Sequence, residues 1–137
     1  MDPGPTLGPD GVASVTSPVS VGDTVTRLTR IIADRGLILF SVVDHSGEAK
    51  KVGLDLPDTK LVIFGSPAAG TPLMQAAPLA ALDLPLKLLV WADRDGTVRV
   101  SYTTPSYLAA RYGLDDELRA RLEPIEAIAN ATVADSA

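Results

Sequence analysis

Two polar turns contain the residue types that could do chemistry. The first spans residues 65–71, GSPAAGT, with the spacing G-x-x-x-x-G-T after a short apolar run. Glycine-rich turns that lead into a helix direct backbone N–H groups and a partial positive charge at one spot, which suits an anion. A nucleotide-binding P-loop also needs a lysine and a magnesium-binding hydroxyl, but Thr71 and Pro72 occupy these positions. The pattern argues against an NTPase.

Two roles stay open for this turn. In one, Ser66 and Thr71 hydroxyls join the backbone N–H groups around an anion or another polar ligand. In the other, Gly65 and Gly70 permit a tight turn and Thr71 caps a short helix that begins at Pro72.

The second polar turn contains His45, the only histidine of the chain. Because Asp44 precedes it, an oriented imidazole could serve as a general base or a metal ligand. A lone histidine at the end of a strand is also common as a hydrogen-bonded structural residue. Met74 would complete a His–Met ligand pair for haem or copper if it met His45, and otherwise fills the core. The nucleophile-elbow pattern G-x-S-x-G of many hydrolases does not occur.

We expect the two turns to face one another across a concave site beside an apolar layer. The candidate ligand-binding residues are His45, Gly65, Ser66, Gly70, Thr71 and Met74, and the catalytic candidates are His45 and Asp44. These residue types do not identify a cofactor, and we expect no metal site built from them.

Composition narrows the class of partner. The chain has 137 residues, 46% of them hydrophobic, and a net charge of −5. Aromatic residues make up 4%, and no basic run exceeds Lys50–Lys51, which argues against nucleic acid. Asp83 and Lys87 interrupt the most apolar segment, so no membrane span is expected. There is no cysteine and no visible secretory signal, which favours a cytoplasmic protein.

Hydrophobic periodicity predicts the elements. A helix is expected from residue 21 to about 35, with Ser20 as its N-cap, Asp23 in a capping box and Gly36 after its end. Strands are expected at 12–19, 37–43, 60–64, 86–92 and 97–103, with a tight hairpin at Asp95-Gly96. Further helices are expected at 48–52, 72–77, 106–112 and 115–131, the last broken or kinked at Pro124.

The order β-α-β-(α)-β-α-β-β-α predicts an α+β fold with a mainly antiparallel sheet and helices packed on one face. Residues 1–11 are rich in proline and glycine and are expected to form a flexible arm. Residues 12–137 are expected to form a single domain.

Three segments resemble the domain of unknown function 302 family: VVDHSGEAKKVGLDL, IFGSPAAGTPLMQAAPLAALDLPLKLLVW and SYTTPSYLAARYGL. The resemblance extends over residues 19–133. It implies a TATA-box-binding-protein-like α+β fold and a homodimer. The name of that fold carries no DNA-binding implication, and the family supplies no catalytic residues to carry over.

The sequence therefore predicts a homodimeric domain that binds a small molecule or anion and has no assigned activity. Three alternatives remain: an enzyme with His45 as general base, a haem or metal binder through His45 and Met74, and a structural or interaction module with a large apolar dimer surface.

Overall fold

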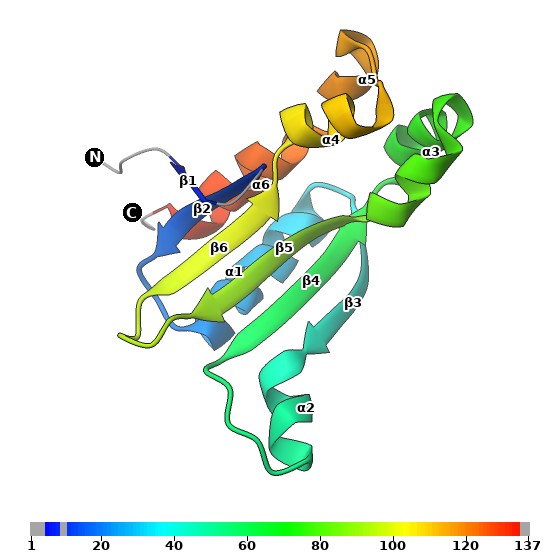
Figure 1. Ribbon diagram of the computed structural model, residues 1–137. Helices are drawn as coiled ribbons and strands as arrows, with labels where there is room; N and C mark the ends of the chain where they lie inside the picture. Colours follow the sequence, from blue (N-terminus) through cyan, green and yellow to red (C-terminus); the bar gives the residue numbers. More distant parts are fainter. Residues whose placement is uncertain (1–4, 9–10, 135–137) are drawn as a thin grey trace.

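The computed structural model describes residues 5–8 and 11–134. In this part of the chain, six strands form one antiparallel sheet in the order β1-β2-β6-β5-β4-β3 (Figure 1). The strands are β1 Thr6–Leu7, β2 Val12–Ser17, β3 Ile38–Asp44, β4 Thr59–Gly65, β5 Leu86–Ala92 and β6 Val98–Thr103. The helices are α1 Val21–Asp34, α2 His45–Lys51, α3 Pro67–Ala76, the 3₁₀ helix η1 Pro78–Asp83, α4 Pro105–Tyr112, α5 Asp116–Ala120 and α6 Pro124–Val133. The expected α+β class is confirmed.

Helices α1 and α6 pack side by side on one face of the sheet and enclose the core (Figure 1). The spacing of Val21, Leu28 and Ile32 puts their side chains on one side of α1, and all three are buried. They pack with alternate residues of the strands, among them Val62, Phe64, Leu88, Val90, Val100 and Tyr102. The expectation that helices pack on one face is therefore confirmed.

The ends of α1 follow from local chemistry. The Ser20 side chain accepts a hydrogen bond from the Asp23 backbone N–H at 3.1 Å, as the capping pattern predicts. Gly36 has φ +71°, a left-handed conformation that glycine adopts without a Cβ clash, and it ends the helix.

The remaining helices lie at the two ends of the sheet. Helix α2 extends from one end, directly after β3, whereas α3, η1, α4 and α5 gather at the other (Figure 1). Because β3 and β4 are antiparallel, Ile38 at the start of β3 lies opposite Gly65 at the end of β4. The start of β3 therefore lies at the α3 end of the sheet, and its end lies at the α2 end.

Two predicted boundaries were wrong. Helix α2 begins at His45 rather than at residue 48, because Asp44 caps it. Helix α3 begins at Pro67 rather than at Pro72, because Ser66 and Pro67 already form a cap and a first helical position. The break predicted at Pro124 is confirmed: the final helical segment consists of α5 and α6, and α6 begins at Pro124.

The predicted N-terminal arm is described only in part. Thr6 and Leu7 form β1, which pairs with Ser14 and Ala13 of β2. Residues 1–4 and 9–10, on which the rest of that prediction falls, lie outside the described residues.

We expect Leu28→Ala to lower the free energy of unfolding by about 2–5 kcal/mol, because the side chain is fully buried between helix and sheet and its removal leaves a cavity. Urea denaturation followed by circular dichroism measures this change. Leu7→Ala is the matched control, because Leu7 is 75% exposed and its loss should change stability by less than about 0.5 kcal/mol. Equal losses in the two variants would contradict this assignment of the core.

Candidate functional site

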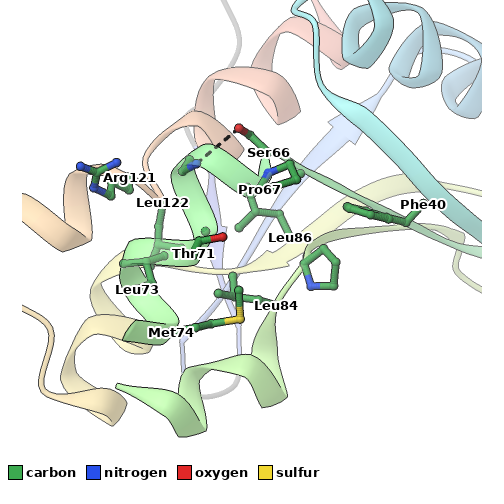
Figure 2. Close-up of a pocket in the computed structure, with 14 residues that line it drawn as sticks. Phe40, Ser66, Pro67, Thr71, Leu73, Met74, Leu84, Leu86, Arg121 and Leu122 are labelled. Atoms are coloured by element: carbon green, nitrogen blue, oxygen red, sulfur yellow. Dashed lines mark hydrogen bonds between the residues drawn. The ribbon is translucent and has the colours of Figure 1, made fainter. Parts of the chain in front are cut away.

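A pocket of about 210 Å³ lies at the end of the sheet where α3 begins. It is bounded by α3, by the segment that leads into β5 and by the edge strand β3 (Figure 2). Its walls are mainly apolar and include Phe40, Leu73, Met74, Leu84, Leu86 and Leu122. A protein cavity of about 150 Å³ is enough to hold benzene, so this pocket has room for a small organic molecule.

Three polar side chains also line this pocket: Ser66, Thr71 and Arg121. The Thr71 hydroxyl points toward the space between α3 and Leu86 in the close-up (Figure 2). Arg121 and Phe40 lie at opposite ends of the view, which gives the pocket one cationic end and one aromatic end (Figure 2). The described residues that line the pocket include no carboxylate and no imidazole.

The first turn of α3 does not form the anion cradle that the glycine spacing suggested. Ser66 caps the helix: its hydroxyl accepts from the Ala69 N–H at 3.4 Å, and its carbonyl accepts from the Gly70 N–H at 2.9 Å. Pro67 has no N–H to offer. The expected loop at 65–71 is therefore wrong: residues 67–71 are helical and the backbone donors of Ala69 and Gly70 bond within the helix.

Gly65 and Gly70 leave space in the pocket, and neither is needed for a left-handed turn. Neither Gly65 nor Gly70 has a positive φ. An added Cβ at Gly70 would have Leu84 Cδ1 as its nearest neighbour at 4.0 Å, and one at Gly65 would meet Pro85 Cβ at 3.6 Å. Both would sit in ordinary van der Waals contact, so the missing side chains leave room in the pocket.

Five of the predicted ligand-binding residues line this one pocket: Gly65, Ser66, Gly70, Thr71 and Met74. His45 does not join them. It is exposed at the start of α2, one residue after Asp44, which pairs with Lys60 at the far end of β4 from Gly65. Seven strand residues separate the two turns by about 20 Å. The expected single site between the two turns is therefore wrong within one chain, and so is a His45–Met74 ligand pair.

The Asp44 carboxylate caps α2, and these capping hydrogen bonds compete with any bond that would orient His45. Its carboxylate accepts from the Gly47 N–H at 2.9 Å and from the Ser46 hydroxyl at 2.9 Å. These bonds to the charged form lower the pKa of Asp44. An added Cβ at Gly47 would lie 2.4 Å from the Asp44 carboxylate, so a side chain there would displace the capping group.

Sequence reasoning missed two of the pocket's distinctive residues. Phe40 belongs to an apolar run and carries no sign of facing a cavity. Arg121 follows the helical pattern of a solvent-facing side chain. Each reaches the pocket only through tertiary packing, Phe40 from the edge strand and Arg121 from the turn after α5.

Beside this pocket, Asp83 forms a second polar cluster that sequence reasoning also missed. The Tyr112 hydroxyl donates to the Asp83 carboxylate, and Arg111 lies 3.5 Å from the same oxygen. The hydrogen bond to Asp83, together with burial and the nearby negative charge, raises the pKa of Tyr112. Lys87 donates to the Pro85 carbonyl at 2.9 Å, and burial lowers the pKa of its ammonium group. Among the described residues, no group of three or more His, Cys, Asp or Glu side chains could hold a metal ion.

The fold and the site define a class: a small α+β domain with helices over one sheet face and an apolar pocket at one sheet end. The chain belongs to the family described as domain of unknown function DUF302, whose model matches residues 13–131. The resemblance seen in the sequence is therefore confirmed.

A solved structure agrees with this fold. It is described as the crystal structure of uncharacterized conserved protein DUF302 from Bacillus stearothermophilus, and it superposes with a TM-score of 0.75. The match covers 90% of this chain and 96% of that chain at 19% sequence identity. At this identity the likeness shows the fold alone.

Longer proteins also contain a related segment. Two proteins named fluoride-specific ion channel FluC 1, from Brucella suis biovar 1 and Brucella abortus biovar 1, are 41% identical to this chain over 104 residues. That segment is 76% of this chain but 41% and 38% of the two relatives, so the chain spans about two-fifths of their length. Within the residues that the structure describes here, no helix has the length and apolar character needed to cross a membrane.

We expect Asp83→Asn to lower the pKa of Tyr112 toward the ordinary tyrosine value of about 10, because the variant lacks the negative charge that disfavours the phenolate. The neutral phenol donates to Asp83, so the pair stabilises the fold below the ordinary tyrosine pKa and loses this contribution as pH rises through the raised value. Titration of ring-labelled tyrosines by NMR measures the shift. Tyr102, whose pKa is raised chiefly by burial, is the internal control and should not move. An unchanged Tyr112 titration would contradict the pairing.

Proposed function

We propose that this chain is a homodimeric domain that binds a small organic anion, one with an apolar body and a carboxylate or similar head group. The observation that carries this proposal is the pocket at the start of α3, where apolar walls are combined with a few polar groups. The apolar body packs against Leu73, Leu84 and Leu86. The head group binds at the end that contains Arg121, with the Thr71 hydroxyl as a further donor.

The lining favours binding over catalysis. General acid–base chemistry needs a titratable group within hydrogen-bond reach of the substrate. The described residues of this pocket offer two hydroxyls and a guanidinium, and the Ser66 hydroxyl already caps α3. His45, the general base of the enzyme alternative, lies about 20 Å away along the strand.

Fluoride is one of the anions to test, because the relatives named above are called fluoride-specific ion channels. A small, strongly hydrated anion loses much solvation in an apolar pocket that offers few donors. We therefore propose that this domain takes an organic anion rather than fluoride, and that in those longer proteins it serves as a ligand-binding unit attached to the channel.

We expect phenylacetate to stabilise the wild-type protein and not Gly70→Val. A ligand at about ten times its Kd adds ~1.4 kcal/mol of stability, which raises the Tm by roughly 3–6 °C. The Cβ of the valine fits, because its nearest neighbour lies 4.0 Å away, and its methyl groups take up space next to Leu84, which lines the pocket. Thermal unfolding with phenylacetate, sodium phosphate and sodium fluoride measures the shifts.

Gly22→Val is the matched control for this experiment. Gly22 is also helical, and its nearest neighbour to an added Cβ is likewise 4.0 Å away, but it lies on α1 far from the pocket. It should keep the wild-type response to phenylacetate. An equal phenylacetate shift in both glycine variants, or a shift with none of the three compounds in wild type, would overturn the proposed site.

We expect Arg121→Gln to weaken phenylacetate binding by about two- to fivefold, the usual worth of an exposed ion pair, and to leave binding of the neutral phenylacetamide unchanged. Isothermal titration calorimetry gives both constants. Arg119→Gln is the control, because Arg119 pairs with Glu123 and does not line the pocket. Equal losses for the acid and the amide would show that Arg121 acts on the fold rather than on the charge of the ligand.

A further inference from the structure

β3 is an apolar edge strand, and up to Val43 no charged residue or proline protects its unpaired backbone edge. In the described sheet it pairs only with β4, so its other side presents free backbone N–H and C=O groups. Residues 37–43, LILFSVV, contain no charged residue and no proline, the usual guards of a free edge. Ile38, Leu39, Phe40 and Val42 are 45%, 43%, 50% and 37% exposed. The opposite edge, β1, is only two residues long.

Other exposed apolar side chains lie at the two ends of the sheet. Val52 and Leu54 follow α2 at one end, and they are 71% and 64% exposed. Leu79 and Leu82 belong to η1, which packs against α3 at the other end, and they are 70% and 71% exposed. Exposed apolar groups gathered along one side of a molecule mark an interaction surface.

We propose that two copies of this chain pair antiparallel along β3, about a two-fold axis near Ser41 and Val42, and that the pairing closes the open side of the ligand pocket. The partner strand must be apolar on both of its faces, and β3 itself meets that condition. The free backbone groups of the two edges then join both sheets into one. This inference rests on the proposed function only in what it says about the pocket.

The two-fold axis also matches what lies beyond the strand. It brings the α2 end of one copy, which has the exposed Val52 and Leu54, to the α3 end of the other, where η1 has the exposed Leu79 and Leu82. It also brings Arg35, before β3, toward the partner's Glu48, after β3. A stable dimer needs about 800 Å² from each partner, more than a short strand pair supplies. The flanking leucines extend the surface on both sides.

The same axis gives His45 a place at the site. Within one chain His45 lies at the far end of β3 from the pocket. Across the antiparallel pair, the partner's His45 comes beside the start of β3, next to the Phe40 end of the pocket. The two polar turns predicted to share a site then do so between two copies, at the side of the pocket that a monomer leaves open.

Oligomeric state provides the first test. Analytical ultracentrifugation without ligand, from about 5 to 200 μM as suits a specific interface, should show dimers for the wild type and monomers for Val42→Lys, which puts a charge on the paired edge. Leu7→Lys, on the opposite edge strand and 75% exposed, should remain dimeric. A monomeric wild type, or a folded Val42→Lys that stays dimeric, would overturn the proposal. Circular dichroism reports the fold of each variant.

Cross-linking tests the geometry in a protein that need not be disrupted. The chain has no cysteine, so single substitutions report one position each. Residues that face each other across the axis lie about 4.5–5.5 Å apart between Cα atoms, within the range of a disulfide. Ser41→Cys or Val42→Cys should oxidise to a disulfide-linked dimer, and Thr26→Cys on α1 should not. Dimers that cross-link no faster at 41 or 42 than at 26 would place the interface elsewhere.

The contribution of His45 is tested by a double-variant comparison. His45→Ala should weaken phenylacetate binding about threefold or more in the wild-type background, the effect of one exposed contact, and have no effect in Val42→Lys. An equal loss in both backgrounds, or none in either, would remove the partner's His45 from the site. A dimer that binds no phenylacetate refutes the proposed function and leaves the interface standing. Binding by a protein that stays monomeric refutes the interface alone.

Discussion

The antiparallel pairing of β3 with β4 is the constraint on which the arrangement of the site depends. It sets Ile38 against Gly65 and Asp44 against Lys60, so the two polar turns that flank these strands lie at opposite ends of the sheet. The pairing holds because alternate residues of the sheet, such as Val62 and Phe64, are buried beneath α1 and α6. A slip by one residue would turn these side chains away from the core. The core therefore determines the strand register, and the register determines which turns can meet.

Much of the fold was predictable because its signals are local. Ser20 and Gly36 bound α1 through a side-chain cap and a left-handed backbone, and both depend on residues a few positions away. The fold class followed from the order of apolar runs. Prediction failed where two local signals competed, as at Pro67 and Pro72, either of which could begin a helix. Sequence alone did not show that the helix would start at the first proline and continue through the second.

The site was less predictable, because its walls come from distant parts of the chain. The segment 65–74 contributes much of the pocket, and its glycines and hydroxyls were recognisable from type and spacing. Phe40 and Arg121 were not, since the side they face depends on how β3 and α5 pack against α3. The glycine spacing also led to a wrong prediction of what these glycines do. It resembled a loop of free N–H donors, whereas Gly70 is helical and contributes the space that a side chain would have filled.

In the proposed dimer, ligand binding and strand pairing are two coupled equilibria, because the pocket borders the free sheet edge. Phe40 belongs to both, because it lines the pocket, is half exposed and is part of the edge strand β3. If the paired form of the edge encloses a ligand better than the free form, the ligand stabilises pairing, and pairing raises ligand affinity by the same factor. This reciprocity needs no moving lid or catalytic group. The position of the pocket beside an apolar edge strand is what would link ligand binding to assembly in the proposed dimer.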